Sequence, residues 1–538
     1  MSKGALAIFT MLMLGALASL SCSRAQEVPQ AGSIIPANMP RVGTVDERFQ
    51  SFNVEIIEVT GGRFWKPFKD IEAALKACQK SADARGATPA GMDPSFYEPR
   101  GPIDLSNARL RKLAAALGPA YMRVSGTWAN TTYFHDADTP PPAKPAAGFG
   151  GVLTRTEWKG VLDFSKAVDA KIVTSFATGP GTRDAQGNWT PKEARKLLSY
   201  TKAEGGSIAA AEFMNEPTAA AMGGAPKGYD ANSFGRDLKI FHPFIKNAAP
   251  DMILLGPGSV GESVPLGNAL TAGSMPFLKS EDLLAASGPA FDAFSYHFYG
   301  AVSNRCASIG EGATTTPEAA LSAEWLSRTD TAEAFYQRLR ERFEPGKPLW
   351  VTETADAACG GNAWASTFLD NFRYLDQLGR LAKKGVQVVI HNTLASSDYG
   401  LLDENSLTPR PNYWAALLWR KHMGSVVLDA GATPAPALQL YAHCLRGQAG
   451  GVAILAINTD RTSAHTLDMR APSERYTLSA EHVEDAAVRL NGNELKLGPL
   501  DTLPEMNGTS INAGEVTLAP ETVTFFAVPS ANNPACRQ

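Results

Sequence analysis

This chain of 538 residues lacks a large excess of positive or negative charge, because 50 Lys and Arg are balanced by 54 Asp and Glu. The formal net charge is -4, the pI is near 6.1, and the basic residues are scattered without forming a run. Such a surface creates no long-range field that would recruit nucleic acid or an anionic membrane. The composition therefore argues against a nucleic-acid-binding protein.

Cysteine is also sparse, with six residues, at positions 22, 78, 306, 359, 444 and 536. None forms a Cys-x-x-Cys pair, and the eight histidines show no His-x-x-x-His spacing. Zinc sites depend on clustered ligands of this kind. We therefore expect no metal site and no cofactor.

Long apolar runs are limited to residues 5–20, which follow Lys3. Small residues come next, and Ser-Arg-Ala ends at Ala25, as is typical of an export signal. The run is too short for a comfortable membrane span, and no later run is long enough. We interpret residues 1–25 as a signal peptide, with a buried N-terminal helix as the alternative, and expect a periplasmic or extracellular protein. Leu-Ser-Cys at Cys22 resembles a lipoprotein cleavage site, so a lipid anchor there stays open.

Most of the chain alternates β-prone apolar runs with amphipathic helical stretches. The predicted strands are 53–60, 120–128, 171–178, 207–215, 252–257, 291–299, 348–354 and 386–392. The predicted helices include 154–170, 191–203, 233–247, 331–343 and 365–384. Eight such units favour a (β/α)8 TIM barrel over 53–425. The alternative is a doubly wound open sheet, but no Gly-x-Gly-x-x-Gly turn follows the first strand.

The segments on either side of this region have other patterns. Residues 26–40 are expected to be a flexible leader, and 41–52 an extended segment that joins a sheet. From 426 to 538, short alternating runs punctuated by Gly, Asn and Pro predict a C-terminal antiparallel β-sandwich. Long segments at 139–150 and 302–327 fall where strand-to-helix loops carry active sites in a barrel.

Two glutamates end predicted barrel strands. Glu216, in Asn-Glu-Pro, follows the fourth strand, and Glu353, in Thr-Glu-Thr, ends the seventh. A barrel places these two tips across one bound sugar, the arrangement that glycoside cleavage requires. We predict a carboxyl separation of about 5 to 5.5 Å, which is typical of retention, whereas more than about 6.5 Å would indicate inversion.

Other polar residues lie at the same predicted face. Tyr299, at the end of the sixth strand, is positioned to donate to Glu353, with His297 in support. Asn215 can hold a sugar hydroxyl, and the loop with Ser397 and Tyr399 can bind sugar oxygens or a carboxylate. A packed aromatic rim is the alternative interpretation of the tyrosines.

Four blocks together resemble glycoside hydrolase family 79, the heparanase and β-glucuronidase family within clan A of barrel glycosidases. The blocks are residues 117–127, 215–217, 352–361 and 399–414. The resemblance implies that Glu216 is the acid/base and Glu353 the nucleophile, with Tyr299 in contact with the nucleophile. It also implies sugar binding by Thr127 and a uronic acid carboxylate held by Tyr399 and main-chain groups near Gly360.

The resemblance further implies a disulfide between Cys444 and Cys536. The chain departs from the family at Ala358-Cys359 and Ser397-Asp398, and in the length of segment 302–327. Because Cys306 and Cys359 both fall on predicted loops of the active-site face, a disulfide between them is a further hypothesis. The pairing of Cys78 stays open.

The expected function is retaining hydrolysis of β-linked glucuronic acid or a related uronide in a glycan or glycoside. Exo action is favoured, because long loops tend to close one end of a cleft. The alternatives are an endo-acting heparanase-like enzyme, a neutral-sugar glycosidase of the clan, and a barrel that binds polysaccharide without cleaving it. The expected partner is this carbohydrate, with no nucleic acid, and with a membrane only through a lipid at Cys22.

Overall fold

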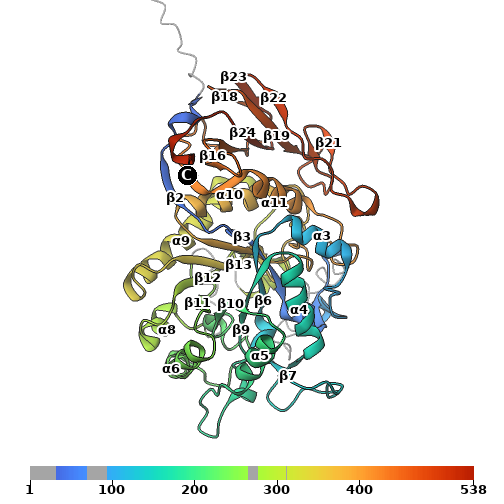
Figure 1. Ribbon diagram of the computed structural model, residues 1–538, viewed down its shortest axis with the longest axis vertical. Helices are drawn as coiled ribbons and strands as arrows, with labels where there is room; N and C mark the ends of the chain where they lie inside the picture. Colours follow the sequence, from blue (N-terminus) through green and yellow to red (C-terminus); the bar gives the residue numbers. More distant parts are fainter. Residues whose placement is uncertain (1–31, 70–93, 264–276, 310–311, 538) are drawn as a thin grey trace, which may run out of the picture.

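The computed structural model describes residues 32–69, 94–263, 277–309 and 312–537. Eight parallel strands form a closed barrel in chain order, and the last pairs with the first (Figure 1). They are β3 (Gln50–Glu55), β6 (Ala120–Ser125), β9 (Ala170–Ser175), β10 (Ile208–Glu212), β11 (Ile253–Ser259), β12 (Ala293–Val302), β13 (Leu349–Ala358) and β14 (Val388–His391). The predicted TIM barrel is confirmed, and the open doubly wound sheet is wrong.

The first barrel strand differs from its predicted bounds of 53–60. It begins at Gln50 and ends at Glu55, after which α1 (Ile56–Thr60) forms. The Glu58 side chain accepts from the Glu55 backbone N–H at 2.6 Å and so caps this helix. The β-prone residues after Glu55 are therefore helical, because the capping box outweighs their strand preference.

Helices surround the barrel, and each of the five predicted ones is present with shifted ends. They are α4 (Arg155–Ala167), α5 (Lys192–Ala203), α6 (Ala231–Ala248), α9 (Ala323–Phe343) and α10 (Leu369–Lys383). Thr154 caps α4 by accepting from the Glu157 backbone N–H, and Asp230 caps α6 in the same way from Ser233. Three further helices are α3 (Ala108–Ala116), α8 (Ser280–Ser287) and α11 (Pro411–His422).

Short elements decorate the barrel loops and the sandwich. Two small sheets pair β4 (Gly62–Trp65) with β5 (Tyr97–Arg100), and β7 (Thr132–His135) with β8 (Gly151–Thr154). The 3-10 helices are η1 (Pro36–Asn38), η3 (Pro94–Phe96), η4 (Thr127–Thr131), η5 (Pro180–Thr182), η6 (Pro217–Ala219), η7 (Asn304–Ile309), η8 (Ala319–Leu321), η9 (Pro499–Asp501) and η10 (Pro534–Cys536).

The C-terminal region forms two sheets packed together, as expected for a sandwich. The nine-stranded sheet contains β2 (Arg41–Thr44), β15 (Met423–Leu428), β16 (Leu438–Leu445), β17 (Val452–Asn458), β19 (Ser473–Ser479), β20 (Arg489–Leu490), β21 (Asn493–Glu494), β22 (Thr509–Ile511) and β24 (Thr522–Val528). The smaller sheet contains β1 (Gly32–Ile34), β18 (His465–Met469) and β23 (Gly514–Leu518). Alternation in β17 divides the faces: Ile454 packs toward the smaller sheet and Leu455 toward the barrel.

The N-terminal part of the described chain differs from the expected leader. Gly32–Ile34 pairs in parallel with Leu467–Met469, and Ile34 and Met39 are buried in the sandwich. The Asn533 amide donates to the Met39 carbonyl at 2.9 Å. These contacts hold residues 32–40, so the expected looseness is wrong for them; residues 26–31 lie outside the described part.

The segment expected to be extended, 41–52, is divided between the two domains. Arg41–Thr44 pairs with β15 of the sandwich, and Gln50 to Phe52 belong to the barrel. The predicted signal peptide, Cys22 and Cys78 lie outside the described residues. Within the described part, no helix is long and apolar enough to cross a membrane.

The described residues contain two disulfides. Cys444–Cys536 joins β16 to the end of the chain, as the family resemblance implies. Cys306–Cys359 joins η7 to the end of β13, at the face of the barrel where the parallel strands end. The first therefore ties the last described residues to the sandwich, and the second ties the segment after β12 to the segment after β13.

Candidate active site

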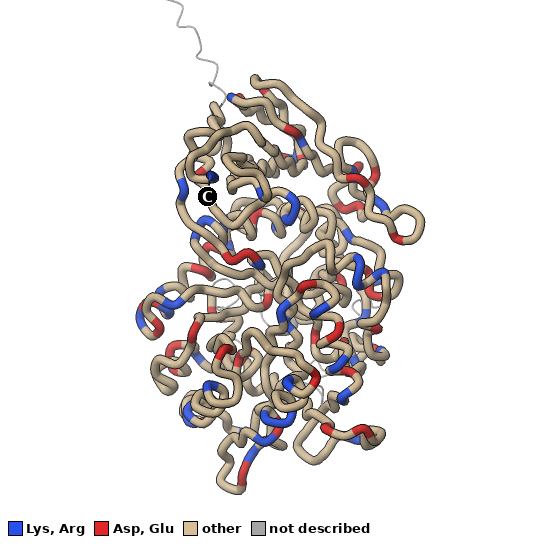
Figure 2. Tube along the Cα trace, viewed as in Figure 1, with Lys and Arg blue, Asp and Glu red and all other residues tan. Residues whose placement is uncertain are grey.

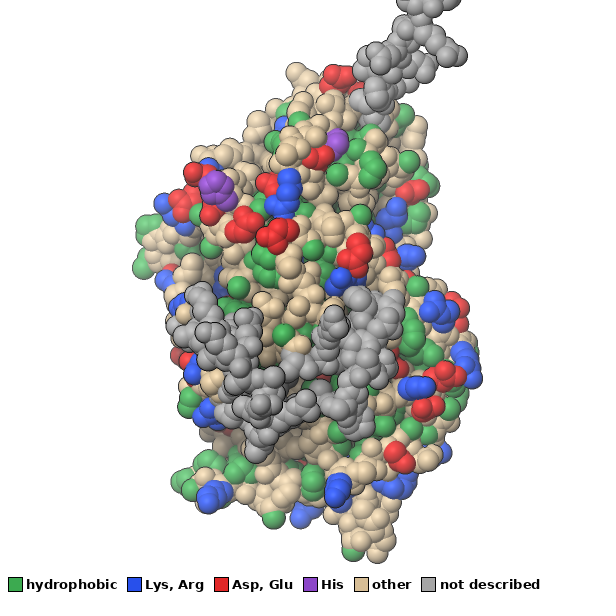
Figure 3. All heavy atoms as spheres, turned by 180° about the vertical axis from the view of Figure 1, so that it is seen from behind, with side chains coloured by type: hydrophobic (Ala, Val, Ile, Leu, Met, Phe, Trp, Pro, Cys, Tyr) green, Lys and Arg blue, Asp and Glu red, His purple; other side chains and the backbone are tan. Residues whose placement is uncertain are grey.

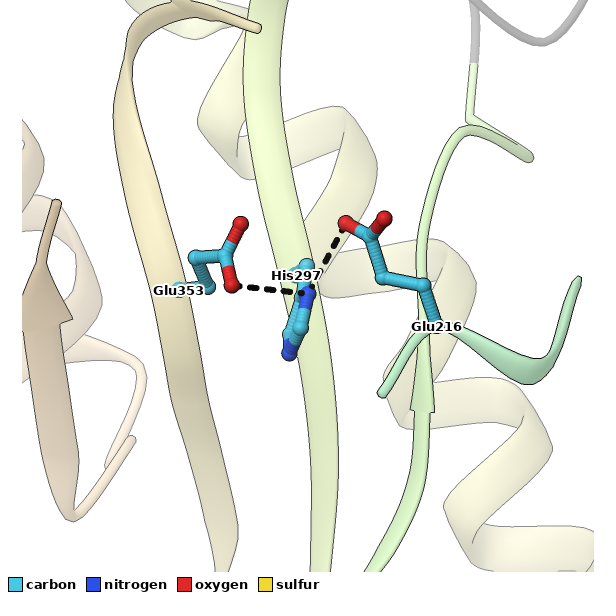
Figure 4. A group of neighbouring side chains, drawn as sticks. All are labelled: Glu216, His297 and Glu353. Carbon is cyan, nitrogen blue, oxygen red and sulfur yellow. Dashed lines mark hydrogen bonds and ion pairs between the residues drawn. The ribbon is translucent and has the colours of Figure 1, made fainter. Parts of the chain in front are cut away.

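Glu216 and Glu353 approach each other on either side of His297 (Figure 4). One carboxylate oxygen of each glutamate and a His297 ring nitrogen all lie within 4.8 Å of one another. Glu216 follows β10 with a left-handed backbone, φ 48° and ψ 62°, and directly precedes η6. Glu353 lies within β13, opposite His297 of β12. The strand continues past Glu353 to Ala358, beyond its predicted end.

Both oxygens of Glu353 accept hydrogen bonds. The Tyr299 hydroxyl donates to Oε1 at 2.6 Å, and Arg123 Nη1 donates to Oε2 at 2.7 Å. The guanidinium balances the negative charge, and the two donors fix the direction of the carboxylate. An ionised, precisely aimed oxygen is what a nucleophile requires.

Glu216 has a different environment. Burial raises the pKa of its carboxyl; a 3.0 Å hydrogen bond from His297 Nδ1 partly lowers it, and the charge of Glu353 raises it. The net effect is a pKa above the ordinary range for glutamate. Two carboxyls with opposed environments are typical of an acid/base and nucleophile pair.

A buried ion pair lies beneath these groups, between Arg123 of β6 and Glu212 of β10. Arg123 Nη2 donates to Glu212 at 2.8 Å and to the Asn215 side chain at 2.7 Å. Ser295 and Thr352 also donate to Glu212. Burial raises the pKa of the Glu212 carboxyl, but the charge of Arg123, the hydrogen bond and charge of His297, and the hydrogen bond from Thr352 together lower this pKa below the ordinary range. The pair therefore acts as a fixed charged support for Glu353 and Asn215.

The roles of Arg123 and Glu212 were not predicted from the sequence. The available signal was a charged residue inside or at the end of an otherwise apolar strand, in Tyr-Met-Arg-Val and Ala-Ala-Ala-Glu. A buried charge in a barrel strand requires a partner, and so indicates a polar centre.

The glutamates line a cavity of about 650 Å³. Its polar lining includes the predicted Thr127, Asn215 and Tyr399, and also Glu55 and Asn392. The Asn392 amide donates to the hydroxyls of both Tyr399 and Tyr299, at 3.1 and 3.0 Å. The cavity therefore places hydroxyl, amide and carboxyl groups around the two glutamates, an arrangement that suits sugar recognition.

Glu55, which ends the first barrel strand, was also missed. Its Oε2 has no hydrogen-bond partner among the described residues, and burial together with Glu353 raises the pKa of this carboxyl well above its ordinary value. Gly126, at φ 95°, packs so closely that a Cβ there would lie 1.5 Å from this oxygen. The glycine therefore makes room for a carboxyl that lines the cavity.

Three predicted residues do not line the cavity. His297 is buried between and behind the glutamates. Gly360 follows Cys359, which does line it, and a Cβ on Gly360 would lie 2.9 Å from both Trp65 and Arg305.

Ser397 is the third, and its predicted contact with substrate is not supported. Its backbone has a left-handed φ of 61°, its N–H donates to Glu404 at 3.2 Å, and its carbonyl accepts from Arg410. This turn uses the Ser397 backbone to support the loop, and Tyr399 lines the cavity instead.

Arg305, in the unassigned segment 302–327, organises one side of the site. Its buried guanidinium donates to the Cys359 and Gly361 carbonyls at 3.1 and 3.0 Å, and to Asp398 at 2.5 Å. It therefore connects the loop after β13 with the loop that carries Tyr399. The available signal for this role was a long insertion with a cysteine beside the arginine.

The group formed by Glu216, His297 and Glu353 is the one set of described side chains with metal-like spacing. Burial alone lowers the pKa of His297, but the surrounding carboxylates, Glu353 foremost, raise it to about 9. A protonated imidazole offers no lone pair to a cation, and Arg123 already donates a hydrogen bond to the Glu353 carboxylate. The donor set therefore suits proton transfer better than metal binding.

Comparisons with known proteins agree with this geometry. A family model described as glycosyl hydrolase family 79, N-terminal domain, matches residues 102–379. Heparanase-like protein 3 of Arabidopsis thaliana is 24% identical over 96% of each chain. Hyaluronoglucuronidase of Hirudo nipponia is 26% identical over 83% of this chain and 95% of its own. Heparanase of Mus musculus is 27% identical over 82% of this chain and 89% of its own.

Solved structures show the same fold. A 4-O-α-L-rhamnosyl-β-D-glucuronidase from Fusarium oxysporum gives a TM-score of 0.57 at 13% identity, covering 93% of this chain and 99% of that one. A family 51 arabinofuranosidase from Xanthomonas axonopodis gives 0.57 at 14% identity, covering 93% and 98%. At such identities the likeness is one of architecture, a barrel with an attached β-domain.

Proposed function

Because the chain belongs to glycoside hydrolase family 79, we propose that it is a retaining, exo-acting β-glucuronidase. The observation that carries this proposal is the unequal pair of glutamates. Glu353 is ion-paired and doubly hydrogen-bonded, whereas burial raises the pKa of Glu216. Their oxygens approach within 4.8 Å, which favours direct attack by a carboxylate over attack by an intervening water.

In the first step, Glu353 attacks the anomeric carbon and Glu216 donates its proton to the leaving oxygen. The glycosidic bond breaks, and a covalent glycosyl ester forms on Glu353. In the second step, Glu216 takes a proton from water, the hydroxide oxygen bonds to the anomeric carbon, and the ester bond to Glu353 breaks. The two inversions give net retention of configuration.

A uronic acid is the proposed sugar at this site. Tyr399 and Asn392 lie next to Tyr299 at one side of the cavity, and Glu55 and Asn215 supply further polar atoms. The related proteins named hyaluronoglucuronidase and baicalin-β-D-glucuronidase support a glucuronide for this chain. We propose that the Tyr399 hydroxyl contacts the sugar carboxylate and that Thr127 contacts a ring hydroxyl.

Exo action is proposed because bulky groups lie close to the Tyr399 side. Trp65 and Tyr97 stack at 4.4 Å in the small β4–β5 sheet, and Gly360 packs against Trp65. The Cys306–Cys359 disulfide and Arg305 hold this wall in place. A glycan that continued past the terminal sugar on this side would meet these side chains.

A panel of p-nitrophenyl glycosides tests the proposal. We expect hydrolysis of the β-glucuronide and at most about a hundredth of that kcat/KM on the β-glucoside, because the latter lacks the carboxylate. Proton NMR of the first-formed product should show β-glucuronic acid. An α-product would contradict retention, and a preference for the β-glucoside would indicate a neutral-sugar enzyme. Internal cleavage of a glucuronic acid polymer would indicate the endo-acting alternative.

We also propose that the protein is exported. The composition of residues 1–25 supports a signal peptide, and Cys22 supports a lipid anchor as a second form. The N-terminal sequence of the mature protein distinguishes them: Gln26 at the start indicates release, and a blocked, lipid-modified Cys22 indicates anchoring. An unprocessed Met1 in the cytoplasmic fraction would contradict export.

A further inference from the structure

One side of the cavity, next to Glu216, is apolar. Ala219, Met222, Val260 and Phe277 line the cavity there, and we call them the acid-side wall. Ala219 ends η6, which begins directly after Glu216. All four belong to one apolar cluster, Ala219 and Val260 as buried members and Met222 and Phe277 packed against them.

A fully buried threonine fixes this wall. The Thr218 hydroxyl donates to the Val260 carbonyl at 2.9 Å and accepts from the Val260 N–H at 3.0 Å. The Thr218 carbonyl accepts from the Leu278 N–H at 2.8 Å. Three segments, after β10, after β11 and before α8, are thereby joined in one arrangement. A surface held in this way is preorganised to bind a ligand.

The position of the acid identifies what this wall contacts. A general acid must lie within hydrogen-bond reach of the leaving oxygen. The leaving group therefore departs on the Glu216 side of the sugar, and the acid-side wall is adjacent to its path. Glu353, to which the Tyr299 hydroxyl donates, attacks the reacting carbon from the opposite side.

The charge of the cavity disfavours an anionic leaving group. Among the described lining residues, Arg63 is the single Lys or Arg, so this part of the lining has no cluster of basic side chains. Sulfated or repeatedly carboxylated polysaccharides are recognised by clustered basic side chains, whereas a single sugar carboxylate can be held by hydroxyl donors such as Tyr399. Figure 2 shows Lys and Arg interspersed with Asp and Glu along the chain, and the rear face in Figure 3 shows the same mixture outside its grey atoms.

Aromatic rings supply much of the remaining lining. Phe64 and Trp128, which also line the cavity, meet edge to face at 5.2 Å. With Phe277, they give the cavity flat apolar surfaces suited to a planar ring.

We infer that the natural leaving group is an aromatic aglycone, so that the substrate is a phenolic β-glucuronide and not a sulfated or carboxylated polysaccharide. This inference rests on the proposed function and specifies its substrate class. The acid-side wall binds the ring through apolar contact, while Glu216 protonates the phenolic oxygen.

The test compares two β-glucuronides whose leaving groups have similar acidity, phenyl and 2-naphthyl. In the wild type we expect the naphthyl compound to have about a tenfold higher kcat/KM, because its second ring meets the wall. In Met222→Lys this naphthyl-to-phenyl ratio should fall to near one. In the matched variant Met222→Leu it should stay within about twofold of wild type. A ratio cancels any general loss of catalysis.

A sulfated disaccharide with terminal β-glucuronic acid completes the set. For the wild type, its kcat/KM should be lower than that of the naphthyl compound. In Met222→Lys, the ratio of its kcat/KM to that of the naphthyl compound should rise. A wild-type ratio near one, or a preference for the sulfated disaccharide, would overturn the inference while leaving the glucuronidase function intact. Failure to hydrolyse any of the three glucuronides would instead reject the proposed function.

Discussion

At the scale of single residues, the site separates two chemically identical carboxyls by their contacts. Glu353 accepts from Tyr299 and Arg123, and Glu216 from His297. The buried Arg123 is paired with Glu353, whereas Glu216 is buried and hydrogen-bonded to the His297 imidazole. This asymmetry supports the proposed roles of nucleophile and acid without any difference in residue type.

Replacing Glu216 with Gln should affect substrates according to their leaving group. For an alkyl β-glucuronide, we expect kcat/KM to fall about 10²–10⁴-fold, because proton donation is lost. For 2,4-dinitrophenyl β-glucuronide, whose leaving group needs no proton, the first step should be nearly unaffected and a burst of dinitrophenol should appear. Stopped-flow absorbance measures this burst. Glu353→Gln should remove both activities, and an equal loss on both substrates in Glu216→Gln would contradict the acid assignment.

His297 is a positioning residue whose effect should appear in the pH profile. Its hydrogen bond lowers the pKa of Glu216. In His297→Asn the pKa of Glu216 should rise, so the alkaline limb of kcat/KM should move to higher pH while the maximum falls about tenfold. Profiles of kcat/KM from pH 4 to 10 measure this shift. An unchanged alkaline limb with a lower maximum would reduce His297 to a packing role.

At the scale of elements, loops after the barrel strands are held by a few specific bonds. Arg305 and the Cys306–Cys359 disulfide secure the loop after β13, and Glu58 caps α1 behind the first strand. The strands themselves were predictable from apolar runs, because each run is long enough to pair. Their ends were not, because a single capping bond such as that from Glu55 to Glu58 decides where a strand stops.

Loss of the two disulfides should have different consequences. In the double variant Cys306→Ser/Cys359→Ser, KM for a glucuronide should rise several-fold, because Cys359 lines the cavity. In Cys444→Ser/Cys536→Ser, KM should stay constant while Tm falls by several degrees, since that bond closes a loop of 92 residues in the sandwich. Steady-state kinetics and calorimetry of both variants separate the effects. A raised KM in the second variant alone would contradict this division.

Glu58 should make stability depend on pH. Burial raises the pKa of its carboxyl to about 8 in the folded state, whereas the unfolded value is near 4.5. The folded state therefore binds more protons between these values, and this group's contribution to stability falls as the pH rises from 4.5 to 8. In Glu58→Gln, Tm relative to wild type should rise by a few degrees from pH 5 to pH 8. Glu481→Gln, at an exposed position, should show no such trend. A constant difference for Glu58→Gln would contradict the raised pKa.

At the scale of the whole molecule, the sandwich and the barrel share a buried boundary. The nine-stranded sheet packs one face on the barrel helices α10 and α11 and the other on the three-stranded sheet (Figure 1). Strands β1 and β2 come from the N-terminal end of the described chain. The sandwich therefore combines segments that precede and follow the barrel in the sequence. The family model matches residues 102–379, which lie within the barrel domain, but the packing indicates that barrel and sandwich form one folded unit.

Tyr441 tests this boundary. Its hydroxyl donates to Asp376 of α10 at 2.5 Å, across the interface. Tyr441→Phe leaves the buried carboxylate with one donor fewer, and we expect a loss of about 1–3 kcal/mol in the free energy of unfolding. Tyr476→Phe, whose hydroxyl bonds to Glu474 on the same strand, should cost less than about 1 kcal/mol. Equal losses in chemical denaturation would show that the interface bond adds nothing specific.

The sequence by itself determined the eight-strand barrel, the β-rich C-terminal region and the two glutamates, because periodicity and strand-end motifs are local properties of the chain. The tertiary structure alone placed Arg123 against Glu353, left an oxygen of Glu55 unpaired in the cavity, and turned Ser397 into loop support. It also grouped Met222, Val260 and Phe277 beside the acid. These arrangements join residues far apart in the chain, and a contact between two side chains depends on the closed barrel that brings them together.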